Sequence, residues 1–161
     1  MWTTKQLFDI LENHEVETAA LERQLIALSE ALDSDLEEIR HRVYPGAVSY
    51  DRDRIQTTPT PADTRLVAVV QACDERREQY KRDVAVILGR IRQIRTVYST
   101  IQESLGGLDK AVLLNLYYPR RSAEAVAGMM GTSSKTVNRR RDAAVEALKT
   151  ILLKKFFKND R

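Results

Sequence analysis

The sequence predicts an all-α protein: a long helical hairpin or coiled coil, followed by a C-terminal module of short helices. Three observations lead to this prediction. The 161 residues include only four prolines and six glycines, so few positions interrupt a helix. Apolar residues recur at alternating steps of three and four in two long segments, the period of helices that pair. The content of 43% hydrophobic and 30% charged residues is typical of a folded helical chain.

Composition also bounds the class of protein. No window approaches about eighteen consecutive apolar residues, and the N-terminus lacks the pattern of a signal peptide. The single cysteine, Cys73, has no second cysteine with which to form a disulfide within the chain. We therefore expect a cytoplasmic protein without a membrane span.

The first heptad helix is expected over residues 1–43. Thr3 and Gln6 have the spacing of a capping box, in which each side chain binds the other residue's backbone N–H. Asp33 and Ser34 leave open whether the helix continues or breaks there. The expected apolar stripe comprises Leu7, Leu11, His14, Thr18, Leu21, Leu25, Leu28 and Leu32, and continues with Leu36, Ile39 and Val43.

Residues 44–61 are expected to form a linker. Pro59 and Pro61 exclude a continuing helix. The segment is longer than a simple helical hairpin needs, so it either covers the neighbouring helices or recruits a partner.

The second heptad helix is expected over residues 62–105, with Thr60 as its cap and Gly106-Gly107 as its stop. The sequence leaves open whether the two long helices pack on each other, on a second copy of the chain, or on both. The expected stripe comprises Tyr80, Val84, Ile87, Ile91, Ile94, Tyr98, Ile101 and Leu105, and extends backwards through Leu66, Val70, Cys73 and the charged Arg77.

The C-terminal module, residues 108–157, has the boundaries of three helices. The first ends before Pro119, Ser122 caps the second, and Ser133 or Ser134 caps the third.

The connection between the second and third of these helices has the spacing of a helix-turn-helix. Ala127 leaves room for the following helix, Gly131 can adopt a left-handed conformation in the turn, and Val137 returns to the core. We therefore expect a helix-turn-helix module in this part of the chain.

Charge is unevenly divided along the chain. Residues 119–161 hold 11 Lys and Arg against 4 Asp and Glu, whereas the preceding 118 residues have a net charge of −4. The positive charge thus coincides with the expected helix-turn-helix, as for a protein that binds nucleic acid.

The N-terminal residues of the second helix in a helix-turn-helix reach base edges in the major groove. Asn138 can pair with adenine and Arg139 with guanine, while hydroxyl groups and lysine bind phosphate or base acceptors. Arg120 and Arg121 precede the first helix and are placed to hold backbone phosphates. The predicted DNA-binding residues are Arg120, Arg121, Ser133, Ser134, Lys135, Thr136, Asn138, Arg139, Arg140 and Arg141.

Enzymatic signals are weak. His14, His41 and Cys73 lack the spacing of metal ligands, and Gly106-Gly107 lacks the Lys-Ser/Thr of a phosphate-binding loop. We expect neither catalytic activity nor a cofactor or metal.

Residues 109–151 resemble the helix-turn-helix of sigma-factor region 4. Over residues 44–152 the chain is similar to small ArpU- and RinA-type transcription regulators of phages and prophages of Gram-positive bacteria. The resemblance implies a DNA-binding protein in the cytoplasm of a bacterial host that controls phage genes, often late genes. In this family an apolar residue commonly packs inward where Arg140-Arg141 stand, so one arginine must extend past the core or meet phosphate. The matching positions are Leu113, Leu116, Ala123, Val126, Ala127, Met130, Gly131, Ser133, Thr136, Val137, Ala144 and Leu148.

These features predict a sequence-specific DNA-binding transcription regulator. It would bind double-stranded DNA as a homo-oligomer, in the simplest case a dimer, with RNA polymerase as a further candidate partner. Two alternatives remain open. One is a phage small terminase subunit for DNA packaging, a class that more commonly carries its DNA module at the N-terminus. The other is a helical adaptor that binds RNA polymerase or another protein instead of DNA.

Overall fold

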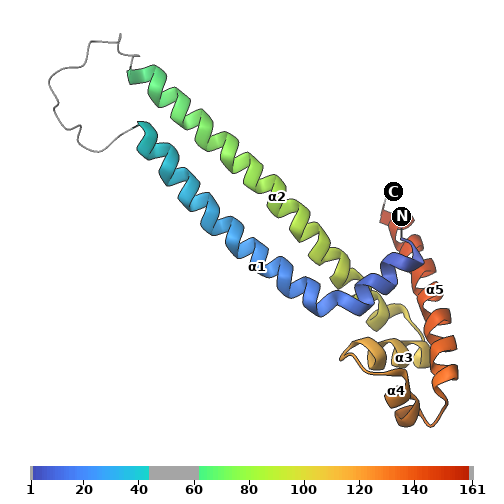
Figure 1. Cartoon of the computed structure of the whole chain (residues 1–161). Helices are drawn as coiled ribbons and strands as arrows, with labels where there is room; N and C mark the ends of the chain where they lie inside the picture. The colour runs from blue at the N-terminus through green and yellow to red at the C-terminus, as the bar shows by residue number, and fades with distance from the viewer. Residues whose placement is uncertain (1, 44–61, 160–161) are drawn as a thin grey trace. The chain divides into compact units, whose positions relative to one another are not determined.

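The computed structural model describes residues 2–43 and 62–159, and within these ranges it consists of helices without a β-strand. The helices are α1 (Thr4–Val43), α2 (Ala62–Ser104), α3 (Gly107–Tyr117), α4 (Ala123–Met130) and α5 (Ser134–Asn159) (Figure 1). The prediction of an all-α fold is confirmed. The linker predicted over 44–61, with the expected Thr60 cap, lies outside the described residues. None of the helices in the described ranges is long and apolar enough to cross a membrane.

The chain divides into two compact units. Unit 1 comprises residues 1–19 and 90–161, and unit 2 comprises residues 20–89. Unit 1 therefore combines the first turns of α1 and the last turns of α2 with α3, α4 and α5. The C-terminal module shares one compact unit with the ends of both long helices.

Within unit 2, α1 and α2 run side by side in opposite directions (Figure 1). The leucines that the sequence places on the stripe of α1 are partly buried: Leu21, Leu25, Leu28, Leu32 and Leu36. Helix α1 continues without interruption through Asp33 and Ser34, which resolves the alternative left open there.

The stripe predicted for the first part of α2 is wrong in its phase. Leu66 and Val70 are 48% and 52% exposed, whereas Val69 and Cys73 are buried. A step of three back from Cys73 leads to Val70, and a step of four leads to Val69. The helix buries the face that includes Val69.

The charged residue on this face of α2 is Arg76 and not the expected Arg77. Arg76 Nε lies 2.5 Å from Asp35 Oδ2 of α1. Arg77 is exposed and pairs with Asp74, one turn earlier on its own helix. The charged residue on the face of α2 that meets α1 is therefore paired with an acidic residue of α1.

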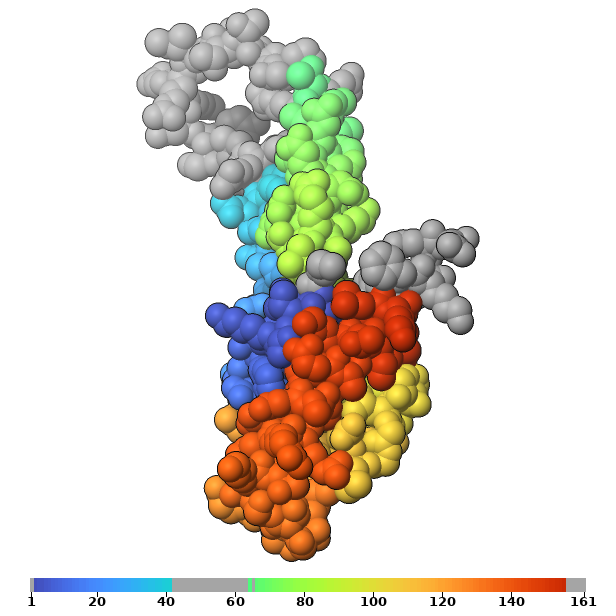
Figure 2. Space-filling view, turned by 90° about the vertical axis from the view of Figure 1, so that its right-hand side faces the viewer, coloured from blue at the N-terminus to red at the C-terminus, as the bar shows by residue number. Residues whose placement is uncertain are grey.

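Unit 1 has a more complete apolar core, to which all five helices contribute. Figure 2 shows the first residues of α1, in blue, lying against α5, in orange and red. Val97 is fully buried in place of the expected Tyr98, which is 41% exposed. Val97 and Thr100 are buried at this end of α2 in addition to Ile94 and Ile101 of the stripe, so its buried face is wider than a heptad stripe. The largest fully buried side chains of unit 1 are Leu7, Ile10, Leu11, Val97, Ile101, Val112, Leu113, Val126, Val137, Val145, Leu148 and Leu152.

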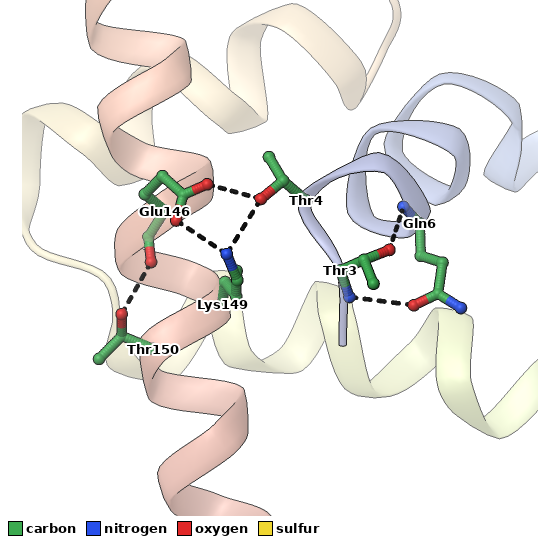
Figure 3. Close-up of polar contacts among 6 residues, drawn as sticks. All are labelled: Thr3, Thr4, Gln6, Glu146, Lys149 and Thr150. Atoms are coloured by element: carbon green, nitrogen blue, oxygen red, sulfur yellow. Dashed lines mark hydrogen bonds and ion pairs between the residues drawn. The ribbon is translucent and has the colours of Figure 1, made fainter. Parts of the chain in front are cut away.

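Polar contacts join the first turn of α1 to α5 (Figure 3). Thr3 and Gln6 form the predicted capping box: Thr3 N donates to Gln6 Oε1 (3.0 Å), and Gln6 N donates to Thr3 Oγ1 (3.2 Å). The Thr4 hydroxyl donates to Glu146 Oε1 (2.5 Å), and Lys149 Nζ donates to Thr4 Oγ1 (3.2 Å) and Glu146 Oε2 (3.2 Å). The hydrogen bonds from Thr4 and Lys149 hold the pKa of Glu146 below its usual value.

Candidate nucleic-acid interface

Both ends of α4 have the local geometry that their residues predict. The Ser122 hydroxyl accepts a hydrogen bond from Ala125 N (3.2 Å) and so caps α4. The helix ends at Gly131, whose φ of 61° and ψ of 37° lie in the left-handed region. Thr132 N then donates to Ala127 O (3.0 Å), which closes the last turn. The chain therefore turns within the three residues 131–133 and starts α5.

The start of α5 uses two of the predicted DNA-binding residues as its cap. Ser133 Oγ accepts a hydrogen bond from Thr136 N (3.2 Å), and the two hydroxyl oxygens lie 2.9 Å apart. Ser134, also predicted to contact DNA, is partly buried in the first turn. The hydroxyl groups of Ser133 and Thr136 are therefore already engaged in the N-terminal cap of α5.

Small apolar contacts fix α4 against α5. Val126 and Val137 are fully buried, and Ala127 is 5% exposed. The three residues named for the turn, Ala127, Gly131 and Val137, thus occupy the positions that their spacing predicts: helix contact, left-handed turn and core.

Lys135, Asn138 and Arg139 form the exposed face of the first two turns of α5. Residues three and four apart lie on the same side of a helix, so the three side chains are neighbours. All three are exposed, and none makes a hydrogen bond or an ion pair with another described residue. We refer to these three residues as the α5 face.

Arg120 and Arg121 lie directly before α4, and both are exposed. Arg120 Nη1 donates to the backbone oxygen of Glu12 in α1 (3.3 Å). Arg121 Nη1 donates to Asn115 Oδ1 of α3 (3.1 Å). Arg121 Nη1 also donates to Met129 Sδ (3.6 Å). In both arginines these bonds use Nη1 alone, and the other N–H groups remain as donors.

Arg140 and Arg141 differ in what they touch. Arg140 is 43% exposed and approaches Asp109 at 4.0 Å. The Arg141 guanidinium lies over the ring of Phe8, 5.3 Å from its centroid, and Nη2 lies 2.7 Å from Asp142 Oδ1. Arg141 is thus the arginine that extends across an apolar side chain, and it does so against α1.

Two residues of α1, Phe8 and Glu12, belong to this surface and were not predicted from the sequence. Phe8 lies under the Arg141 guanidinium, and the backbone oxygen of Glu12 accepts a hydrogen bond from Arg120. Burial raises the pKa of Tyr117 in α3. The positive charges of Arg141 and Arg120 lower this pKa, whereas the negative charges of Glu12 and Asp142 raise it. The one available signal is that Phe8 and Ile10 widen the apolar stripe in the first turns of α1.

His14 is used in packing. Its ring centroid lies 4.1 Å from that of Tyr118, and the Tyr98 ring packs against Tyr118 at 4.8 Å, tilted by 55°. Burial raises the pKa of Tyr118 to about 12, and its hydroxyl oxygen has no hydrogen-bond partner among the described residues. In the described ranges, no group of three or more His, Cys, Asp or Glu side chains is arranged to hold a metal ion. The chain matches no model of a protein family, no curated protein and no solved structure.

Proposed function

We propose that this chain is a sequence-specific DNA-binding transcription regulator, with α4 and α5 as a helix-turn-helix and α5 as the helix that enters the major groove. The observation that carries the proposal is the α5 face. Two cationic residues and one amide stand exposed and unpaired among the described residues, immediately after a capped turn. Unpaired donors at this end of the second helix are what direct readout of base edges requires.

The α5 face offers chemically distinct contacts. The amide of Asn138 can donate to and accept from an adenine, and the guanidinium of Arg139 can donate twice to a guanine. Lys135, in the first turn, suits a phosphate or a guanine acceptor. Such base contacts would supply sequence preference.

Contacts to the DNA backbone would come from the arginines around the turn. Arg120, Arg121 and Arg140 are exposed or partly exposed, and their remaining N–H groups can bind phosphate oxygens. These contacts would supply affinity that depends steeply on salt but not on sequence.

Pairing of two chains and control of phage or prophage genes complete the proposal. In the described part of unit 2, Val69 and Cys73 are the only buried apolar side chains, while Ile26 and Leu88 are 60% and 45% exposed. A hairpin with so little core gains stability from a second copy, and a dimer would present two α5 faces to a two-part operator. The resemblance to phage regulators supports the assignment to phage genes, and RNA polymerase remains a candidate partner.

The test compares two single-charge deletions on α5. Sequences bound by the full chain are first selected from random duplex DNA, and affinity is then measured for Arg139→Ala and Lys154→Ala. Both residues are exposed and have no partner among the described residues, but Lys154 lies about four helical turns beyond Arg139 on α5. Arg139→Ala should lose about 1–3 kcal/mol on the selected sequence and relax preference at one base pair. Lys154→Ala should bind like the parent.

Other outcomes would favour the alternatives. Equal affinity of the parent and Arg139→Ala on every sequence would remove α5 as the recognition helix. Assembly into a large ring would favour a DNA-packaging role, and binding to RNA polymerase without binding to DNA would favour an adaptor.

A further inference from the structure

Three residues of α1 at spacing four contact side chains that surround the proposed interface. Thr4 bonds to Glu146 and Lys149 of α5 (Figure 3), Phe8 lies under the Arg141 guanidinium, and Glu12 accepts a hydrogen bond from Arg120. Residues four apart share one face of a helix, so these contacts form a single row along the first three turns of α1.

Two members of this row, Phe8 and Glu12, hold guanidinium groups from different elements. Arg120 precedes α4, and Arg141 lies in the second turn of α5. Their anchors are one helical turn apart, about 6 Å along the axis of α1. Both guanidinium charges lower the pKa of the same residue, Tyr117, against the larger effect of burial.

We propose that Phe8 and Glu12 are positioning residues, which hold Arg141 and Arg120 as a pair of clamps for neighbouring phosphates of one DNA strand. This inference rests on the proposed function. Arginine has a long, flexible side chain, so fixing its direction before binding lowers the entropy lost when it meets a phosphate.

Neither contact occupies all the N–H donors of the arginine that it holds. Phe8 offers Arg141 the face of its ring, so Phe8 itself occupies none of the N–H groups at the guanidinium edge. Glu12 supplies only its backbone oxygen, and that accepts one of the five N–H donors of Arg120. Both guanidiniums therefore keep donors for phosphate.

Asp142 opposes this role. Its Oδ1 lies 2.9 Å from Nε and 2.7 Å from Nη2 of Arg141. The carboxylate therefore competes with a phosphate for the edge of the guanidinium, and it also repels a phosphate directly. Removal of this charge should strengthen DNA binding.

The test uses Phe8→Leu and the matched Phe8→Tyr in the full chain. Leucine retains apolar bulk without a π face, whereas tyrosine retains the aromatic ring. Affinity for a duplex of about 30 base pairs, three helical turns, is measured between about 50 and 200 mM salt, together with the melting temperature of each variant. Phe8→Leu should weaken binding about two- to fivefold and flatten the log–log salt slope by about one phosphate. Phe8→Tyr should keep both values, and Asp142→Asn should tighten binding about twofold.

The outcomes separate this inference from the function on which it rests. If the parent shows no salt-dependent DNA binding, the proposed function fails and the clamp fails with it. If the parent binds and Phe8→Leu matches it in affinity and slope, the clamp alone is refuted. An equal loss for Phe8→Leu and Phe8→Tyr, or a loss explained by a lower melting temperature, would also refute it, since packing alone would then account for the effect.

Discussion

Gly131 and Gly128 should respond in opposite ways to the same substitution. Both lie at the end of α4, and an added Cβ would meet no atom within 4 Å at either position. They differ in backbone conformation: Gly128 is helical, whereas Gly131 has a φ of 61°. A difference between Gly131→Ala and Gly128→Ala therefore reports on conformation and not on steric contact.

The magnitude follows from this conformation. An L-residue in the left-handed region costs about 1–2 kcal/mol, and the lower entropy of alanine in the unfolded chain offsets about 0.4–1 kcal/mol of this cost. Gly131→Ala should therefore lower the free energy of unfolding of unit 1 by about 1 kcal/mol, or roughly 4–8 °C in melting temperature. Gly128→Ala should raise it by about 0.5–1 kcal/mol, because alanine is the better helix former.

The assay is urea unfolding followed by the fluorescence of Trp2, the single tryptophan, which belongs to unit 1. Gly131→Asn serves as a control, since asparagine tolerates the left-handed region better than alanine and should lose less. Gly131→Ala that is as stable as the parent, or that gains stability as Gly128→Ala does, would refute the assignment of a left-handed turn.

Three further changes concern the core of unit 1. Tyr118→Phe should raise the free energy of unfolding by about 1 kcal/mol, since the buried hydroxyl has no partner among the described residues; a loss measured by urea unfolding would show that the hydroxyl is bonded. The pKa of Tyr118 is raised from 10.0 to about 12, so the folded state keeps a proton that the unfolded chain releases. The free energy of unfolding should therefore be insensitive to this group below about pH 10 and fall towards pH 12, and Tyr118→Phe should reduce that fall; an equal fall in both proteins would contradict it. Leu148→Ala should cost about 2–5 kcal/mol in the same urea assay, because Leu148 is fully buried, and a cost below about 1 kcal/mol would contradict its place in the core.

Local chemistry was the most predictable part of the structure. The capping box at Thr3, the cap at Ser122 and the left-handed Gly131 each depend on a few neighbouring residues, so short sequence patterns suffice to identify them. The stripe of α1 was predictable for the same reason, since leucine repeats there without ambiguity.

Features that depend on distant residues were not predictable. The phase of early α2 depends on which of its faces meets α1, and on that face Arg76 pairs with Asp35 of the other helix. The contacts of Arg120 and Arg141 with α1 join residues more than 100 positions apart, and no local pattern encodes them. The candidate interface was therefore predicted in its α5 face but not in the α1 residues beneath its arginines.

The proposed function is tested most directly by titrating the full chain with a selected duplex while its backbone amide signals are followed by NMR. We expect the signals of Lys135, Asn138 and Arg139 to shift most, together with those of Arg120 and Arg121, while the signal of Lys154 stays in place. Shifts that spare the first two turns of α5 and appear elsewhere would contradict the assignment of α5 as the helix that reads DNA.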